Sequence, residues 1–276
     1  MRILFTGGTG FIGRNAVPFL RRFHEVFAPK RDELDLTDSD AIRSFVMRHS
    51  IDAIVHAANP NPQRTPLDNP SDTSRTMMQM FFAVESCSDI VKKIIYFGSG
   101  AMYDKSRDII LASEDDAWRR IPKDDYGIAK NAMFRLTHGN VINLCVFGCY
   151  GPTDPETKFI THCVRCCLRN EPITIRQDCR FDYIHIEDLS HILNWALVEN
   201  PRANCYNVTT GAPMFLSDIA AEVSSQMNGQ PIVVLTPGLN HEYTGRNVRL
   251  TAEYHAPFIS IREGVSRQIQ SEKRCV

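Results

Sequence analysis

Short apolar runs alternate with amphipathic segments along the first half of the chain. The apolar runs predict strands at 2–5, 25–28, 51–59, 94–99 and 141–148. Between them, apolar residues at every third or fourth position predict helices at 11–23, 38–49, 72–88 and 126–138. This alternation is typical of a doubly wound parallel α/β sheet, whose ligands bind beyond the carboxyl ends of its strands. Gly7 to Gly13, Ala57, Ser99 and Phe147 stand at such ends.

The second half of the chain is less regular. Its pattern predicts helices at 159–169, 187–199 and 216–228, and short strands at 173–176 and 206–208. We therefore expect a Rossmann domain over 1–150, with 181–200 returning to it, and a smaller α/β lobe over 151–276. Two local signals refine the first half. Thr37 and Asp40 predict a capping box before the second helix, and a Pro- and Asn-rich loop spans 59–70.

In the first thirteen residues, MRILFTGGTGFIG, a glycine-rich loop follows the first strand and leads into the first helix. Glycine accepts a positive φ in a tight turn, and without a Cβ it lets a pyrophosphate approach the backbone. The helix that follows directs its free N–H groups and its positive dipole end at the anion. Because the glycines lie between a strand and a helix, they predict a dinucleotide site.

Charge and composition exclude several classes of function. The 31 basic and 32 acidic residues leave a net charge of −1, so we expect no nucleic-acid or anionic-membrane partner. No apolar run is long enough to span a bilayer, and the glycine loop occupies the place of a signal peptide. The nine cysteines then indicate reduced thiols in a cytoplasmic protein. His162, Cys163, Cys166 and Cys167 have helical spacing and lack a second ligand cluster, so no metal site is predicted.

Three residues form a candidate catalytic set. Tyr126 and Lys130 are four residues apart on a predicted helix, which places both side chains on one face. A nearby ammonium is expected to lower the pKa of a phenol, so that Tyr126 could exchange a proton with a carbonyl or an alcohol. Ser99, at the end of the preceding strand, could hold the same substrate oxygen.

Several motifs in order resemble those of the extended short-chain dehydrogenases/reductases that act on nucleotide sugars. They are TGGTGFIG at 6–13, DLTD at 35–38, HAA at 56–58, FGSGAMYD at 97–104, YGIAK at 126–130, CYGP at 149–152, FDYIHIEDL at 181–189 and SIREGV at 260–265. The resemblance implies a Rossmann domain for a nicotinamide cofactor, a lobe for a nucleoside-diphosphate sugar, and catalysis by Ser99, Tyr126 and Lys130. It implies a cofactor site that includes Tyr126 and Lys130 together with Gly7, Gly10, Phe11, Ile12, Gly13, Lys30, Arg31, Asp35, Leu36, Ala57, Ala58 and Phe147.

Departures from the family motifs narrow the reaction. Relatives that remove water from the sugar carry an Asp-Glu pair directly after the position of Ser99, where this chain has Gly100 and Ala101. The epimerising reductase that makes GDP-fucose has a cysteine at the position of Ala101. Because neither residue present can transfer a proton, both reactions are disfavoured. Reduction of a keto-sugar and 4-epimerisation through a transient ketone remain.

The second strand bears on the choice between these two reactions. It ends in Lys30 and Arg31, and cations there suit the 2′-phosphate of NADPH rather than the free ribose of NAD. Asp32 and Glu33 follow at once, so a solvated mixed-charge turn is the alternative. We therefore expect NADPH-dependent reduction of the C4 ketone of a 4-keto-6-deoxy nucleotide sugar. The alternatives are an NAD-dependent 4-epimerase and a non-catalytic NADP(H)-binding sensor.

The substrate residues follow from the resemblance alone. Relatives commonly place an arginine for the diphosphate at the position of Phe181, and this chain has Arg180 one residue earlier. Arg180, Arg246 or Arg249 could supply the cation, or the diphosphate is held differently. Tyr103 and Lys158 are further candidates for the substrate pocket. Relatives often form homodimers through the helices predicted here at 72–88 and 126–138, so a homodimer is expected.

Overall fold

The chain divides into two compact units, and the computed structural model describes residues 1–60 and 72–274 of it. Most of the loop predicted over 59–70 therefore lies outside the described residues. The first unit comprises Met1–Asp104, Glu114–Val146 and Ser190–Tyr206, and the second comprises Lys105–Ser113, Phe147–Leu189 and Asn207–Val276. The assignment of cofactor to one domain and substrate to the other stays a prediction.

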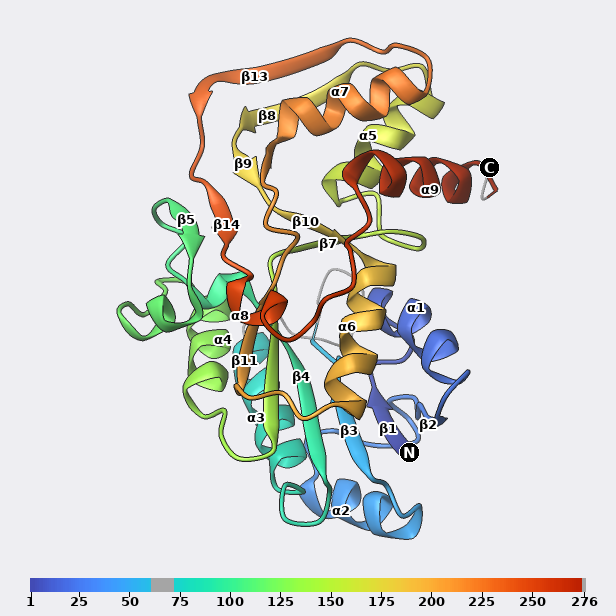
Figure 1. The fold of residues 1–276 in the computed structure, drawn as a ribbon, viewed down its shortest axis with the longest axis vertical. Helices are drawn as coiled ribbons and strands as arrows, with labels where there is room; N and C mark the ends of the chain where they lie inside the picture. The colour runs from blue at the N-terminus through green and yellow to red at the C-terminus, as the bar shows by residue number, and fades with distance from the viewer. Residues whose placement is uncertain (61–71, 275–276) are drawn as a thin grey trace. The chain divides into compact units, whose positions relative to one another are not determined.

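A six-stranded sheet forms the centre of the first unit, in the order β11-β6-β4-β3-β1-β2 (Figure 1). Its strands are β1 (Arg2–Thr6), β2 (Glu25–Phe27), β3 (Ala53–His56), β4 (Lys93–Ser99), β6 (Val141–Val146) and β11 (Cys205–Val208). Neighbouring strands from β2 through β6 pair in parallel. The predicted Rossmann-like α/β class is thus confirmed.

Helices cover both faces of this sheet. They are α1 (Phe11–Leu20), α2 (Ser39–Arg48), α3 (Thr73–Glu85), α4 (Asp125–Arg135) and most of α6 (Ile186–Val198). On one face α1 packs on α6, with the rings of Phe19 and His191 4.7 Å apart between centroids. On the other face α2, α3 and α4 share a core with the sheet (Figure 1). Buried members of this core include Leu4, Ile54, Ile94, Ile42, Phe81 and Met133.

The start of α2 differs from the predicted capping box. Asp38, not Thr37, is the N-cap, and its carboxylate accepts the N–H of Ala41 at 3.0 Å. Thr37 instead donates from its hydroxyl and its backbone N–H to Asp35 Oδ1, at 2.8 and 2.9 Å. The capping-box prediction is wrong because the Asp35 carboxylate engages Thr37 in a turn of its own. An aspartate is an equally strong N-cap, so the helix is still capped.

Lys93, at the start of β4, binds the end of α6. Its ammonium donates to the carbonyl oxygens of Ala196, Leu197 and Glu199 at 2.7, 3.0 and 2.5 Å. The last carbonyls of a helix have no partner within it, and they form the negative end of its dipole. Lys93 therefore anchors α6 to the sheet.

Replacing Lys93 by methionine is expected to lower the free energy of unfolding by about 2 kcal/mol, because several α6 carbonyls lose a charged donor. Chemical denaturation measures the change. Lys92→Met is the matched control, because Lys92 is exposed and pairs with Asp52 at the surface. That control is expected to change the stability by less than about 0.5 kcal/mol. Equal effects of the two substitutions would show that the cap contributes nothing specific.

The second unit contains three small sheets and four helices among its described residues. Its helices are α5 (Phe159–Leu168), α7 (Leu216–Gln226), α8 (Val248–Thr251) and α9 (Ile261–Lys273). Its strands are β5 (Ile109–Ala112), β7 (Gly148–Tyr150), β8 (Ile173–Asp178), β9 (Arg180–Phe181), β10 (Tyr183–His185), β12 (Met214–Phe215), β13 (Ile232–Leu239) and β14 (Tyr243–Gly245). α5, α7, α9 and β8 enclose its core, which includes Ile160, Ile175, Val223 and Ile269.

The sequence pattern assigns no strand to 232–239, where the structure has β13 paired in parallel with β8. The eight described cysteines are free, and all except Cys149 are buried. No helix among the described residues is long and apolar enough to cross a membrane.

Candidate active site

The glycine loop joins β1 to α1 at the carboxyl end of the sheet. Gly7 has a φ of +73°, and a Cβ on it would lie 2.6 Å from the backbone N of Ala58. A Cβ on Gly13 would lie 2.6 Å from Gly8 Cα, so the first turn of α1 can pack on the loop only without a side chain there. Gly10 is the N-cap of α1. The loop thus packs closely on the end of β3 and on α1 because it has no side chains there, and this strand–glycine loop–helix arrangement is the one that fits a dinucleotide pyrophosphate.

The end of β3 is tied to this loop by side chains that the sequence analysis left without a role. Thr6 Oγ1 lies 2.9 Å from His56 Nδ1 and accepts the N–H of Ala58 at 3.3 Å. Since Thr6 accepts from Ala58, its hydroxyl proton is free to bind His56. Burial, and secondarily the charge of Lys130, lowers the pKa of His56 to about 3, so the imidazole is neutral. The HAA motif was the signal that could have revealed this link.

Ser99, Tyr126 and Lys130 come together in the first unit. Ser99 ends β4, and a side-chain hydrogen bond joins it to Tyr126 near the start of α4. Lys130 lies one turn further along α4, with Nζ 5.7 Å from the Tyr126 ring centroid. Its ammonium donates to the carbonyl oxygen of Phe97 at 2.9 Å. The three predicted residues therefore lie next to one another, and Lys130 is anchored to β4.

The titration of this group differs from the sequence-based expectation. Burial raises the pKa of the Tyr126 phenol, and the hydrogen bond from Ser99 offsets only part of that rise. Burial also lowers the pKa of Lys130 to about 8. The expectation that Lys130 brings the pKa of Tyr126 towards neutrality is not met, because loss of hydration dominates. At neutral pH Tyr126 holds its proton.

Gly100 and Ala101 follow Ser99 in a buried 3₁₀ turn, Gly100–Met102. The N–H of Ala101 donates to Ser99 Oγ at 3.1 Å, which orients that hydroxyl. A Cβ on Gly127 of α4 would lie 2.8 Å from the carbonyl oxygen of Ala101, so the turn and α4 are in close contact. No side chain of this turn can transfer a proton beside Ser99.

The turn after β2 carries the residues predicted to choose the cofactor. Lys30 and Arg31 are both exposed, and the Lys30 N–H donates to Glu33 Oε2 at 2.7 Å. Hydrogen bonds from Thr37 lower the pKa of Asp35, and the charge of Arg31 adds to this effect. Ala28, just before the turn, lies beside Gly8, on which a Cβ would be 3.0 Å from Ala28 Cβ. The turn therefore adjoins the glycine loop.

The remaining predicted cofactor residues divide between the units. Phe11 and Ile12 begin α1, Leu36 packs partly on the core of the first unit, and Ala57 donates its N–H to the Thr6 carbonyl at 3.3 Å. Phe147 belongs to the second unit, where it is buried against Tyr243 with 5.1 Å between ring centroids.

The predicted substrate residues are also divided. Tyr103 is buried in the first unit. Lys158, Arg180 and Arg246 belong to the second, where Arg246 is exposed and Lys158 is the N-cap of α5. Arg180 lies 4.0 Å from a Glu242 carboxylate oxygen.

An aromatic group occupies the place where relatives have an arginine. The Phe181 ring stacks on Tyr183 with centroids 4.7 Å apart, and it lies 4.9 Å from the Tyr243 ring. The guanidinium of Arg180 lies 6.0 Å from the Phe215 ring instead. Phe181 is therefore part of an aromatic cluster with Tyr183 and Tyr243. Arg180, the residue before it, is still the candidate cation for the diphosphate.

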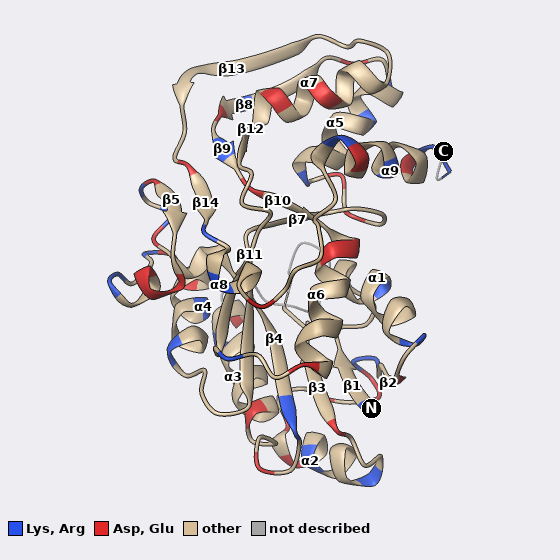
Figure 2. Ribbon diagram, in the orientation of Figure 1, with Lys and Arg blue, Asp and Glu red and all other residues tan. Residues whose placement is uncertain are grey.

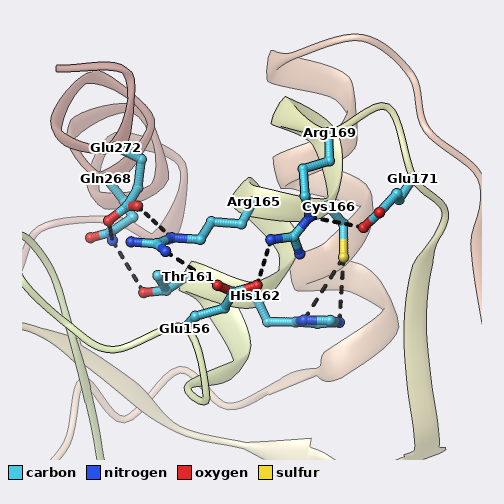
Figure 3. A network of polar contacts seen from close by, with 9 residues as sticks. All are labelled: Glu156, Thr161, His162, Arg165, Cys166, Arg169, Glu171, Gln268 and Glu272. Carbon is cyan, nitrogen blue, oxygen red and sulfur yellow. Dashed lines mark hydrogen bonds and ion pairs between the residues drawn. The ribbon is translucent and has the colours of Figure 1, made fainter. Parts of the chain in front are cut away.

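An ion-pair network anchors the segment that carries Lys158 (Figure 3). Arg165 contacts Glu156 at 3.2 Å and the buried Glu272 of α9 at 2.9 Å. Arg169 contacts Glu156 at 2.6 Å and Glu171 at 2.9 Å. Glu156, two residues before Lys158, is thus held by Arg165 of α5 and by Arg169, the C-cap of that helix.

The cysteine-rich face of α5 lies beside this network. Cys166 Sγ lies 3.5 Å from His162 Nε2 (Figure 3). Cys163, Cys166 and Cys167 are all buried in the core of the second unit. Among the described residues, no group of three or more His, Cys, Asp or Glu side chains is placed to hold a metal ion. Cys166 and His162 are close because they are four residues apart on α5.

Comparison with known proteins supplies the family. The model of the NAD dependent epimerase/dehydratase family matches residues 3–209. GDP-L-colitose synthase from Yersinia pseudotuberculosis is 27% identical over 146 residues, 49% of this chain and 46% of that protein. The matched part thus spans about half the length of this relative.

Two solved structures share the fold at low identity. GDP-mannoheptose C4 reductase from Campylobacter jejuni, with NADP bound, has a TM-score of 0.79 and 17% identity, covering 99% of this chain and 98% of that one. UDP-glucose 4-epimerase from Thermus thermophilus, in complex with NAD, has a TM-score of 0.76 and 20% identity, with both chains fully covered. Since these relatives differ in reaction and cofactor, they support a nicotinamide cofactor without choosing between NAD and NADP. The chain belongs to the NAD dependent epimerase/dehydratase family.

Proposed function

We propose that this chain is an NADPH-dependent reductase of the C4 ketone of a 4-keto-6-deoxy nucleoside-diphosphate sugar. The observation that carries the proposal is the hydrogen bond between Ser99 and Tyr126, with Lys130 beside it. Gly100 and Ala101, which follow Ser99, have no side chain that can transfer a proton. Such a site can deliver one proton to one oxygen. Dehydration and double epimerisation each need further acids or bases.

Tyr126 holds the proton that reduction of a ketone requires, because burial raises the pKa of its phenol. One similar structure is consistent with this direction by its printed name, a GDP-mannoheptose C4 reductase.

In the proposed reaction, the glycine loop with Lys30 and Arg31 would hold NADPH, which would supply the hydride for C4. Ser99 donates a hydrogen bond to the C4 carbonyl oxygen and so fixes its position beside Tyr126. Tyr126 transfers its phenolic proton to that oxygen as the C–O double bond is reduced, and solvent restores the proton afterwards. The ammonium of Lys130, held by the Phe97 carbonyl, stabilises the negative charge that Tyr126 carries in between.

The test is a spectrophotometric assay of the purified chain. It uses NADPH and the 4-keto-6-deoxy products of 4,6-dehydratases acting on GDP-, dTDP- and UDP-sugars. A fall in NADPH absorbance with formation of a 4-hydroxy sugar is expected for at least one nucleotide. Constant absorbance with interconversion of 4-epimers would identify the epimerase instead. Tight NADPH binding without any turnover would identify a sensor.

The preference for NADPH rests on the exposed cations Lys30 and Arg31. Replacing both by alanine is expected to raise the Kd of NADPH by roughly 10- to 100-fold, because the 2′-phosphate loses its charged partners. The Kd of NADH, which lacks that phosphate, is the internal control and is expected to change less than about threefold. Fluorescence titration measures both constants. An equal loss for the two cofactors would refute the proposed role.

We also infer a homodimer through α3 and α4. The large apolar side chains of Phe82 on α3, and of Ile128 and the adjoining Leu136 on α4, are exposed. Exposed apolar side chains on two adjacent helices support a protein interface.

A further inference from the structure

The strand β13 has one open edge. It belongs to a two-stranded sheet, and β8 is its only partner among the described strands. Figure 1 shows β13 along the rim of the second unit, beside β8 and α7. Its side chains are exposed although they are apolar: Val233 by 42%, Val234 by 41%, Leu235 by 63% and Leu239 by 65%. Hydrophobic edge strands of this kind can pair with another chain.

The register shows which backbone groups face outward. Ile232 pairs with Ile173, and the Ile173 N–H donates to the Pro231 carbonyl at 2.9 Å. In a parallel ladder, alternate residues form hydrogen bonds with the neighbouring strand. The backbone N–H and C=O groups of Val233 and Leu235 therefore point toward β8. The N–H and C=O groups of the intervening residues, 232, 234 and 236, therefore point away from β8.

The prolines that flank this segment leave the outward donors intact. The Pro231 carbonyl accepts from the backbone of β8, and the Pro237 carbonyl, six residues later in the same alternation, accepts from the side-chain Nε2 of Gln177 on β8 at 3.4 Å. Both prolines therefore belong to the set that faces β8. A proline usually protects a sheet edge by removing an outward N–H, and neither of these does so.

The strand also lacks the charges that usually prevent edge pairing. No Asp, Glu, Lys or Arg occurs from residue 223 to residue 241. Figure 2 shows β13 free of acidic and basic positions. A neutral edge can meet an identical edge without charge repulsion, and outward N–H and C=O groups at 232, 234 and 236 are complementary to themselves when two such strands run antiparallel.

We propose that β13 is an interaction surface for a second copy of this chain, with two β13 strands pairing antiparallel about a two-fold axis at Val234. In this arrangement Val234 faces its equivalent, and Ile232 faces Thr236 of the second copy. Each copy donates three backbone hydrogen bonds. Five paired residues bury much less than the roughly 1,200 Å² of a stable interface, so the association is in the micromolar range or weaker.

The test compares two lysine substitutions of nearly equal exposure in the full chain. Val234→Lys places two ammonium groups opposite each other across the axis. Val233→Lys faces Leu235 of the second copy and creates no like-charge pair. Sedimentation velocity from about 1 to 100 µM is expected to show, beyond the homodimer through α3 and α4, a further association step in the wild type. Val234→Lys weakens that step by roughly tenfold or more, and Val233→Lys by less than threefold.

Two further measurements make the result specific to β13. Amide hydrogen exchange at 232, 234 and 236 is expected to slow as the wild-type concentration rises. The double variant Val233→Lys with Leu235→Glu pairs opposite charges across the axis, so it is expected to retain association. Fast exchange at every concentration, equal effects of the two lysines, or association lost only in Phe82→Glu would overturn the proposal. NADPH titration confirms that each variant is folded.

Discussion

Replacing Tyr126 by phenylalanine is expected to lower kcat by about 10³-fold, because the variant has no proton to give the C4 oxygen. The Kd of NADPH is expected to stay within about threefold, since the ring remains on α4 and only the hydroxyl is lost. Steady-state kinetics with the keto-sugar that is turned over, and fluorescence titration of NADPH, measure the two quantities. A kcat within tenfold of the wild type would remove Tyr126 from the chemistry.

Tyr96→Phe is the matched control for this experiment. It removes the same atom from a tyrosine of the first unit, where the hydroxyl lies 2.7 Å from Thr137 Oγ1 and away from the proposed reaction. We expect unchanged kcat and a loss of about 1 kcal/mol in the free energy of unfolding, from the lost hydrogen bond. Tyr126→Phe and Tyr96→Phe thus separate a chemical role from a structural one.

Replacing Lys130 by methionine is expected to stabilise the fold while it abolishes most activity. Burial lowers the pKa of Lys130 to about 8 from its ordinary 10.5, so holding the charged form costs about 3 kcal/mol at pH 7. The variant removes that cost but leaves the Phe97 carbonyl without its donor, which offsets about 1 kcal/mol. A net gain near 2 kcal/mol is expected in chemical denaturation, together with a large loss of kcat.

The pH dependence of this gain follows from the same pKa. Between pH 8 and pH 10.5 the unfolded chain keeps the Lys130 proton and the folded chain releases it. Wild-type stability therefore rises with pH in that window through this group, and the advantage of Lys130→Met shrinks. Lys92→Met removes an exposed lysine and is the matched control. A variant less stable than the wild type at pH 7 would contradict the account.

Local sequence patterns predicted much of the fold. The Rossmann-like sheet was predicted from the glycines at 7, 10 and 13 and from the alternation of strands and helices. A tight turn requires glycine and a strand buried on both faces requires an apolar run, and both requirements are visible in a short stretch of sequence. The i, i+4 spacing of Tyr126 and Lys130 placed them on one helix face for the same reason. Pro231 before the strand and Pro237 within it obscured β13 at 232–239, and only its pairing with β8 reveals it.

Two features of the site show why other details escaped prediction. Asp38 caps α2 because the Asp35 carboxylate already holds Thr37, a competition between neighbours that spacing alone cannot resolve. The network of Thr6, His56 and Ala58 joins residues about 50 positions apart, and parallel pairing of β1 with β3 brings them together.

The sequence by itself determined which groups are present and which are adjacent along an element: a glycine cradle, a phenol one turn from an ammonium, a serine at a strand end, and no acid at Gly100 or Ala101. The tertiary structure alone decided their protonation. Packing of α4 on β4 removes water from Tyr126 and Lys130, so the pKa of the phenol rises and that of the ammonium falls. Hydration depends on everything that packs around a group, and no spacing in the sequence encodes it.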